Sequence, residues 1–162
     1  MRRTIPTAFG VLAFLAASLA ARGQTIAPVE GSQAMVGARG IQVPPVARTE
    51  VANMIDAGTI EAEGFSHLTV NLAAELKGPA VRAGVIAAVL IPDIPPYDIA
   101  YRTLGLLPAS LELTAAVAPH GGLYCMAKQQ TLDVGFSRYR VLLYNTSGSS
   151  ATVALSAYRS RT

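Results

Sequence analysis

Side chains suited to acid–base or nucleophilic chemistry are scarce in this sequence, which holds two histidines, His67 and His120, and one cysteine, Cys125. A thiol nucleophile needs a base close by, and His120 precedes Cys125 by five positions. Gly121 and Gly122 between them favour a turn that holds the histidine and a strand that holds the cysteine. The pattern therefore predicts a turn histidine and a small buried cysteine, with a reactive thiol or an intermolecular disulfide as the alternative.

His67 is the remaining candidate for a metal ligand. It falls on the polar side of an alternating stretch, beside Thr69 and Asn71. A zinc site needs several ligands from nearby elements, and the nearest acids, Glu61 and Glu63, precede this stretch. We therefore expect an exposed histidine and no bound metal.

Two carboxylates, Asp93 and Asp98, flank the segment "IPPY", which ends at Tyr97. Such a pair could bind calcium or act as an acid and a base. Its spacing matches no calcium-binding loop, so a surface loop is the favoured interpretation. Because prolines stiffen this loop and leave little ordering entropy to lose, Asp93, Tyr97 and Asp98 are candidate ligand-binding residues.

The common catalytic motifs are absent from the sequence. It contains no HExxH, no P-loop, no GxGxxG and no GxSxG, and "GFSRY" lacks the second glycine of a nucleophile elbow. We therefore expect no enzyme and no cofactor, with a hydrolase as the least favoured alternative.

Opposite charges occupy the two ends of the domain. Residues 49–76 hold five acids and no Lys or Arg, and residues 134–162 hold four arginines and no acid. The favoured interpretation is that the terminal strands lie beside the acidic ones and form cross-strand ion pairs. The alternative is a pair of opposed patches that join neighbouring subunits.

The first 21 residues predict a cleaved signal peptide. Arg2 and Arg3 precede an apolar run from Ala8 to Ala21, which is shorter than a membrane-spanning helix. The arginine pair leaves the general and twin-arginine export routes both open. We expect an exported protein, periplasmic or extracellular, with no membrane span after cleavage.

The composition also limits the partners. Loss of Arg2 and Arg3 with the signal peptide removes two of the three net positive charges, so nucleic acid is not an expected partner. Arginine far outnumbers lysine in this alanine-rich chain, which suggests a bacterial source with a GC-rich genome. A lone cysteine excludes an internal disulfide framework.

The remaining sequence predicts an all-β fold. Residues 22–45 are rich in Gly and Pro and predict an irregular N-terminal arm. In residues 46–162, "HLTVNLAAEL" alternates as a half-buried strand, and "VIAAVLI" is apolar on both faces as a central strand. We expect an antiparallel, jelly-roll-like β-sandwich of about seven or eight strands. An α+β domain is the alternative, because Ile99–Leu107 could form a helix.

Residues 137–161 predict a closing hairpin around "NTSGSS". If Tyr139, Val141 and Leu143 point inward, they match Val153, Leu155 and Ala157 in register. The outer pairs of that register are Arg138 with Tyr158, Arg140 with Ser156, and Tyr144 with Thr152. These pairs predict ordinary surface packing, with a sugar or carboxylate site on Arg138, Arg140, Tyr144 and Tyr158 as the alternative. The loop also carries a glycosylation sequon at Asn145, which a bacterial source would leave bare.

The function favoured by these observations is a non-catalytic binding or accessory module for a glycan, a peptide or an envelope protein. The alternative is a structural subunit, a homo-oligomer that assembles through sheet edges or charged patches. The sequence does not identify the partner protein or glycan.

Overall fold

The computed structural model describes residues 34–77, 80–108, 110–117 and 123–161, with the backbone alone for residues 34–38 and 123–126. The predicted signal peptide and His120 lie outside the described residues. The elements are β1 (Ala34–Val43), η1 (Val51–Asn53), β2 (Ile55–Glu61), β3 (His67–Lys77), β4 (Gly84–Pro92), α1 (Tyr97–Leu104), β5 (Leu111–Val117), β6 (Leu123–Asp133), β7 (Arg138–Asn145) and β8 (Ala151–Ser160).

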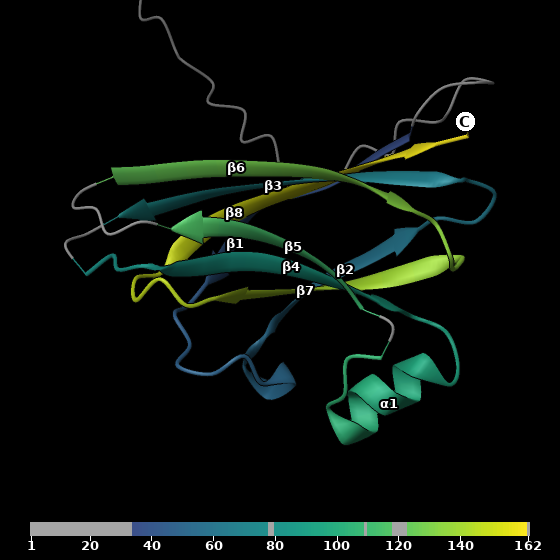
Figure 1. Ribbon diagram of the computed structural model, residues 1–162, viewed down its shortest axis with the longest axis horizontal. Helices are drawn as coiled ribbons and strands as arrows, with labels where there is room; N and C mark the ends of the chain where they lie inside the picture. The colour runs from purple at the N-terminus through teal and green to yellow at the C-terminus, as the bar shows by residue number, and fades with distance from the viewer. Residues whose placement is uncertain (1–33, 78–79, 109, 118–122, 162) are drawn as a thin grey trace, which may run out of the picture.

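The strands form two antiparallel sheets stacked face to face (Figure 1). Sheet A has the order β1-β8-β3-β6, and sheet B has the order β2-β7-β4-β5. The first strand pairs with the eighth, the second with the seventh, the third with the sixth and the fourth with the fifth. The chain is thus one long antiparallel hairpin rolled into two layers, which is the jelly-roll arrangement. The predicted all-β sandwich of seven or eight strands is confirmed.

The core lies between the sheets and follows the predicted alternation. In β3 the inward residues are almost completely buried, from Leu68 at 1% exposed to Leu76 at 0%. Inward side chains of β4 and β7, including Ile86 and Leu143, face them from sheet B. Burial of such aliphatic side chains contributes about 1.5–3 kcal/mol each, so this apolar layer is the main source of stability.

Strand β4 is buried on both faces, as its sequence predicts. Its outer residues Ala87, Val89 and Ile91 form a second cluster with Leu142 and Tyr144 of β7. Two segments cover this cluster and contribute Val46, Val51, Met54, Tyr101 and Leu107. The outer face of sheet B is therefore partly covered by the β1–β2 connection and by the α1 region.

Helix α1 connects β4 to β5 on the outer side of sheet B (Figure 1). It begins at Tyr97, directly after Pro95 and Pro96, and ends where Gly105 adopts a left-handed φ of 64° and donates its N–H to Tyr101. Tyr97 and Asp98 are therefore helical rather than part of a loop. The helix does not add a layer of its own, so the α+β alternative does not hold. No helix among the described residues is long and apolar enough to cross a membrane.

Strand β1 corrects part of the prediction for the N-terminal arm. Residues 22–45 are predicted irregular, but Ala34–Val43 pairs with β8 at the edge of sheet A. The register shifts between Ala38 and Ile41, at a bulge where Gly40 has a φ of 71°. This bulge and the small residues around it hide the period of two that would reveal a strand.

The predicted closing hairpin is wrong. Strand β7 lies in sheet B and pairs with β2 and β4, whereas β8 lies in sheet A and pairs with β1 and β3. Each strand points an apolar row into the same core from opposite sheets. Apolar rows of this kind fit both a hairpin and two facing sheets, so the pattern alone could not distinguish them. None of the three predicted outer pairs forms.

The β7–β8 connection is a buried corner rather than an exposed loop tip. Asn145 and Ser147 are both 0% exposed. The Asn145 amide donates to the carbonyl oxygens of Val43 (3.0 Å) and Ser149 (2.8 Å), and its oxygen accepts from the Ser147 N–H (2.9 Å). The side chain of the sequon residue Asn145 is therefore buried and hydrogen-bonded within the fold, so it is not accessible for glycosylation.

Candidate functional site

Three of the candidate residues meet at the junction of β4 and α1. Asp93 is 5% exposed, and its carboxylate accepts two hydrogen bonds from Arg140, at 3.1 Å each. Arg138 donates to the Asp93 carbonyl oxygen at 2.9 Å, and Arg102 of α1 approaches the carboxylate to 3.5 Å. The prediction that Arg138 and Arg140 face residues of β8 is therefore wrong, because both side chains contact Asp93 instead.

The acidic and basic segments also meet here, which confirms the predicted cross-strand ion pairs. Arg140 contacts Asp56 of β2 at 2.7 Å, and Arg138 approaches Glu61 of β2 at 3.9 Å. Three arginines are thus balanced by three carboxylates within one cluster. We infer that the cluster holds β2, the end of β4, β7 and α1 together, because its charged groups already satisfy one another.

The electrostatics of the cluster agree with this structural role. Burial raises the pKa of Asp93, but the hydrogen bond from Arg140 and the charges of Arg140, Arg138 and Arg102 outweigh it, so the pKa lies below its ordinary value. The hydrogen bond with Asp93 raises the pKa of Arg140, and Asp56 raises it further against the effect of burial. Asp93 is therefore held as a carboxylate, which makes it a poor general acid or base near neutral pH.

Tyr97 and Asp98 do not join Asp93 in a common site. The Tyr97 ring packs edge-to-face on Phe136, with the ring centres 5.1 Å apart. Asp98 lies in the first turn of α1, and one of its carboxylate oxygens is buried without a protein partner. Within the described part of the chain, no group of three or more His, Cys, Asp or Glu side chains could hold a metal ion.

The other two candidate tyrosines lie on opposite outer faces. The Tyr144 hydroxyl donates to the Glu112 carboxylate on the outer face of sheet B, and burial, followed by this hydrogen bond and the charge of Glu112, raises the pKa of Tyr144. Tyr158 lies on the outer face of sheet A, in register with Thr69. The seven candidate residues therefore do not form one site.

The outer face of sheet A presents a surface that the sequence interpretation did not single out. In register, Ala73 of β3 lies between Ala154 of β8 and Ala127 of β6. We call these three residues the alanine row. One step along the strands, Asn71 lies between Ser156 and Gln129. We call these three residues the amide row.

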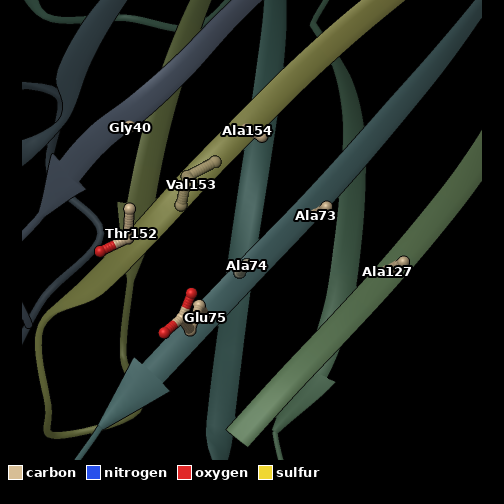
Figure 2. Close-up of a pocket in the computed structure, with 8 residues that line it drawn as sticks. All are labelled: Gly40, Ala73, Ala74, Glu75, Ala127, Thr152, Val153 and Ala154. Atoms are coloured by element: carbon tan, nitrogen blue, oxygen red, sulfur yellow. The ribbon is translucent and has the colours of Figure 1, made fainter. Parts of the chain in front are cut away.

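The alanine row forms the floor of a shallow hollow with a volume of about 530 Å³. Figure 2 shows the three alanines on neighbouring strands, with Thr152 and Glu75 beside them and Gly40 of β1 at the far side. Because alanine side chains are short, a ligand could approach the sheet closely along this row. Cys125 pairs with Glu75 in the same sheet, but its side chain lies outside the described residues, so its predicted burial stays a prediction.

The two outer faces differ in what covers them. Sheet B carries the second apolar cluster beneath the α1 region and the β1–β2 connection, whereas no described helix or strand packs on the outer face of sheet A. Ala73, Ala127 and Gln129 are all exposed there. The alternating pattern of β3 identifies Asn71 and Ala73 as outward residues, but only the register across β8, β3 and β6 brings the rows together.

Comparisons with known proteins identify no family. No family model matches the chain, and no curated protein matches it. Among solved structures, it is similar to a protein of Bacillus endospore appendages described as a novel family of disulfide-linked pili, with 11% identity and a TM-score of 0.34. The alignment covers 86% of this chain and 99% of that chain. A likeness at this level carries no conclusion about function.

Proposed function

We propose that this protein is an exported, non-catalytic binding module that docks its partner on the outer face of sheet A. The observation that carries the proposal is the hollow over the alanine row, on a sheet face that no described element covers. Export rests on the predicted signal peptide of residues 1–21. The saturated ion pairs around Asp93 support a structural rather than a catalytic role for the largest cluster of charged side chains among the described residues.

A long side chain placed in the hollow tests this proposal. The Ala73→Arg variant puts a bulky cation at the middle of the alanine row, and we expect it to weaken docking to envelope fractions of the producing cell by about tenfold or more. Binding of the fluorescently labelled mature protein to these fractions is measured by sedimentation. Thermal unfolding of each variant verifies that the fold is intact.

Ala116→Arg is the matched control, because Ala116 is an exposed strand alanine on the outer face of sheet B, paired with Val85. It should bind as the wild type does. Equal binding by the two arginine variants, or no binding by the wild type, would contradict a docking role for sheet A.

A self-assembling structural subunit is the second candidate, and the edges of the sandwich favour it. Strand β6 pairs with β3 through eleven consecutive residues without a shift, whereas β1 and β2 carry bulges that blunt the opposite edges. A regular free edge can accept another strand. However, Lys128 pairs with the inward-facing Leu72 and is exposed, and a charge in such a position opposes strand addition.

Light scattering separates the two candidates. A binding module should be monomeric at every protein concentration. Oligomers whose size increases with protein concentration would favour the structural subunit. The Gln129→Pro substitution in β6 should then disperse them.

A further inference from the structure

The amide row offers hydrogen-bonding groups that the fold does not use. Asn71 and Gln129 lie side by side in register, and among the described residues no protein group hydrogen-bonds to either side-chain amide. An amide carries a donor and an acceptor on adjacent atoms. Neighbouring hydroxyl groups of a sugar ring each donate and accept, so this pair matches their hydrogen-bonding pattern.

The next row along the strands adds hydroxyls and an aromatic ring. Thr69 lies between Tyr158 and Thr131, and the two threonine hydroxyls hydrogen-bond to each other at 2.9 Å. Tyr158 is half-buried on the same face. A tyrosine offers an apolar ring and a polar tip together, which suits the alternating C–H and O–H groups of a sugar.

Acidic and basic side chains on this face occur as pairs toward its two ends, and one of them, Glu75, also lines the hollow. At one end Lys77 contacts Glu75 at 3.1 Å, and at the other His67 approaches Asp133 to 3.4 Å. The row of Tyr158, Thr69 and Thr131, the amide row and the alanine row hold no acid, lysine or arginine. The charge of Glu75 at the rim of the hollow is balanced by Lys77. Recognition of a charged ligand needs opposite charges in the site, so the middle of the face is matched to a neutral ligand.

Among the side chains that the structure describes on this face, none is a large, exposed hydrophobic anchor of the kind that a protein interface uses. Such interfaces depend on a few large aromatic, aliphatic or arginine side chains that fill pockets. The exposed large hydrophobic residues of the described chain are Ile99, Leu104 and Leu106, in or next to α1 beyond the other sheet. Short side chains, amides and hydroxyls fit a hydroxyl-rich polymer better than a folded protein.

From these observations we infer that the outer face of sheet A binds a neutral polysaccharide segment, an inference that rests on the proposed docking function. The polymer lies across β8, β3 and β6, with its rings over the alanine row and its hydroxyls on Asn71 and Gln129. Strands are about 4.8 Å apart, so three strands offer roughly 10–14 Å, the length of two or three sugar rings.

Affinity electrophoresis tests this inference. The mature protein is run through native gels that contain mixed-linkage β-glucan, galactomannan, arabinoxylan or dextran, and at least one of these neutral polymers should retard it. The double variant N71A/Q129A should weaken that binding by about tenfold or more, because it removes both amides. Ala116→Arg should not change it. Thermal unfolding of the double variant should match that of the wild type, because neither amide hydrogen-bonds to a protein group among the described residues.

Two results would overturn the inference. One is the absence of retardation by all four polymers. The other is that anionic alginate alone retards the protein and that Arg39→Ala abolishes this retardation. Arg39 is the cation tested, because it is exposed beside Gly40 at the β1 side of the hollow. If no neutral polymer binds while Ala73→Arg still abolishes docking to envelope fractions, the docking face stands and its ligand is of another class. If Ala73→Arg also has no effect, the proposed function fails as well.

Discussion

Replacing Asp93 with asparagine is expected to lower the free energy of unfolding by about 3 kcal/mol, the lower end of the range for breaking a buried ion pair. The Asp93 side chain is 6% exposed and accepts two hydrogen bonds from Arg140, whose own side chain is 16% exposed. The neutral amide cannot balance that charge. Arg140 keeps its contact with Asp56 at 2.7 Å, which limits the loss. Urea unfolding at neutral pH measures the change.

Asp133→Asn is the matched control for this variant. Its carboxylate is 97% exposed and approaches His67 to 3.4 Å. Exposed pairs contribute about 0–1 kcal/mol, so the control should change stability little. If Asp93→Asn and Asp133→Asn lowered the free energy of unfolding equally, the ion pairs of Asp93 would not stabilise the fold more than an exposed pair does.

The pH dependence gives a second measure of Asp93. Its pKa is lowered in the folded protein, so the carboxylate stabilises the fold above the unfolded-state value of about 3.9. This contribution is lost as the pH falls through the folded value. The stability difference between wild type and Asp93→Asn should therefore be full at pH 7 and shrink below about pH 4. A difference that stays constant into acid would show that Asp93 acts through shape rather than charge.

The sequence predicts which residues face the core better than it predicts where the chain crosses from one sheet to the other. The alternation in β3 places Leu68 and Leu76 in the core correctly, because a period of two depends only on local order. The apolar row of β7 and that of β8 are equally clear, yet they belong to different sheets. Which strands become neighbours depends on how the chain crosses between sheets, and a Ser- and Gly-rich connection does not reveal that choice.

The candidate site shows the same limit at the level of single residues. The opposite charges of residues 49–76 and 134–162 predict pairing, and Arg140 indeed contacts Asp56. Asp93 follows a strand and precedes prolines, so its surroundings resemble a surface loop, and its burial depends on arginines almost 50 positions away. The alanine row joins positions 73, 127 and 154, and only tertiary register aligns them.

The buried corner after β7 should be as sensitive as the Asp93 cluster. We expect Asn145→Ala to lower the free energy of unfolding by about 3 kcal/mol, since an unsatisfied buried polar group costs about 1–3 kcal/mol and several are left behind. The variant removes the partners of the Val43 and Ser149 carbonyls and of the Ser147 N–H. Urea unfolding again measures the loss.

Asn71→Ala supplies the comparison within the same residue type. Asn71 lies on the outer face of sheet A with no hydrogen-bonded protein group among the described residues, so its loss should change stability by no more than about 0.5 kcal/mol. Asn145 differs from it only in its surroundings, because the chain must cross between the two sheets there and the amide satisfies backbone groups of three residues, Val43, Ser147 and Ser149. Equal effects of the two substitutions would mean that water, rather than Asn145, satisfies this corner.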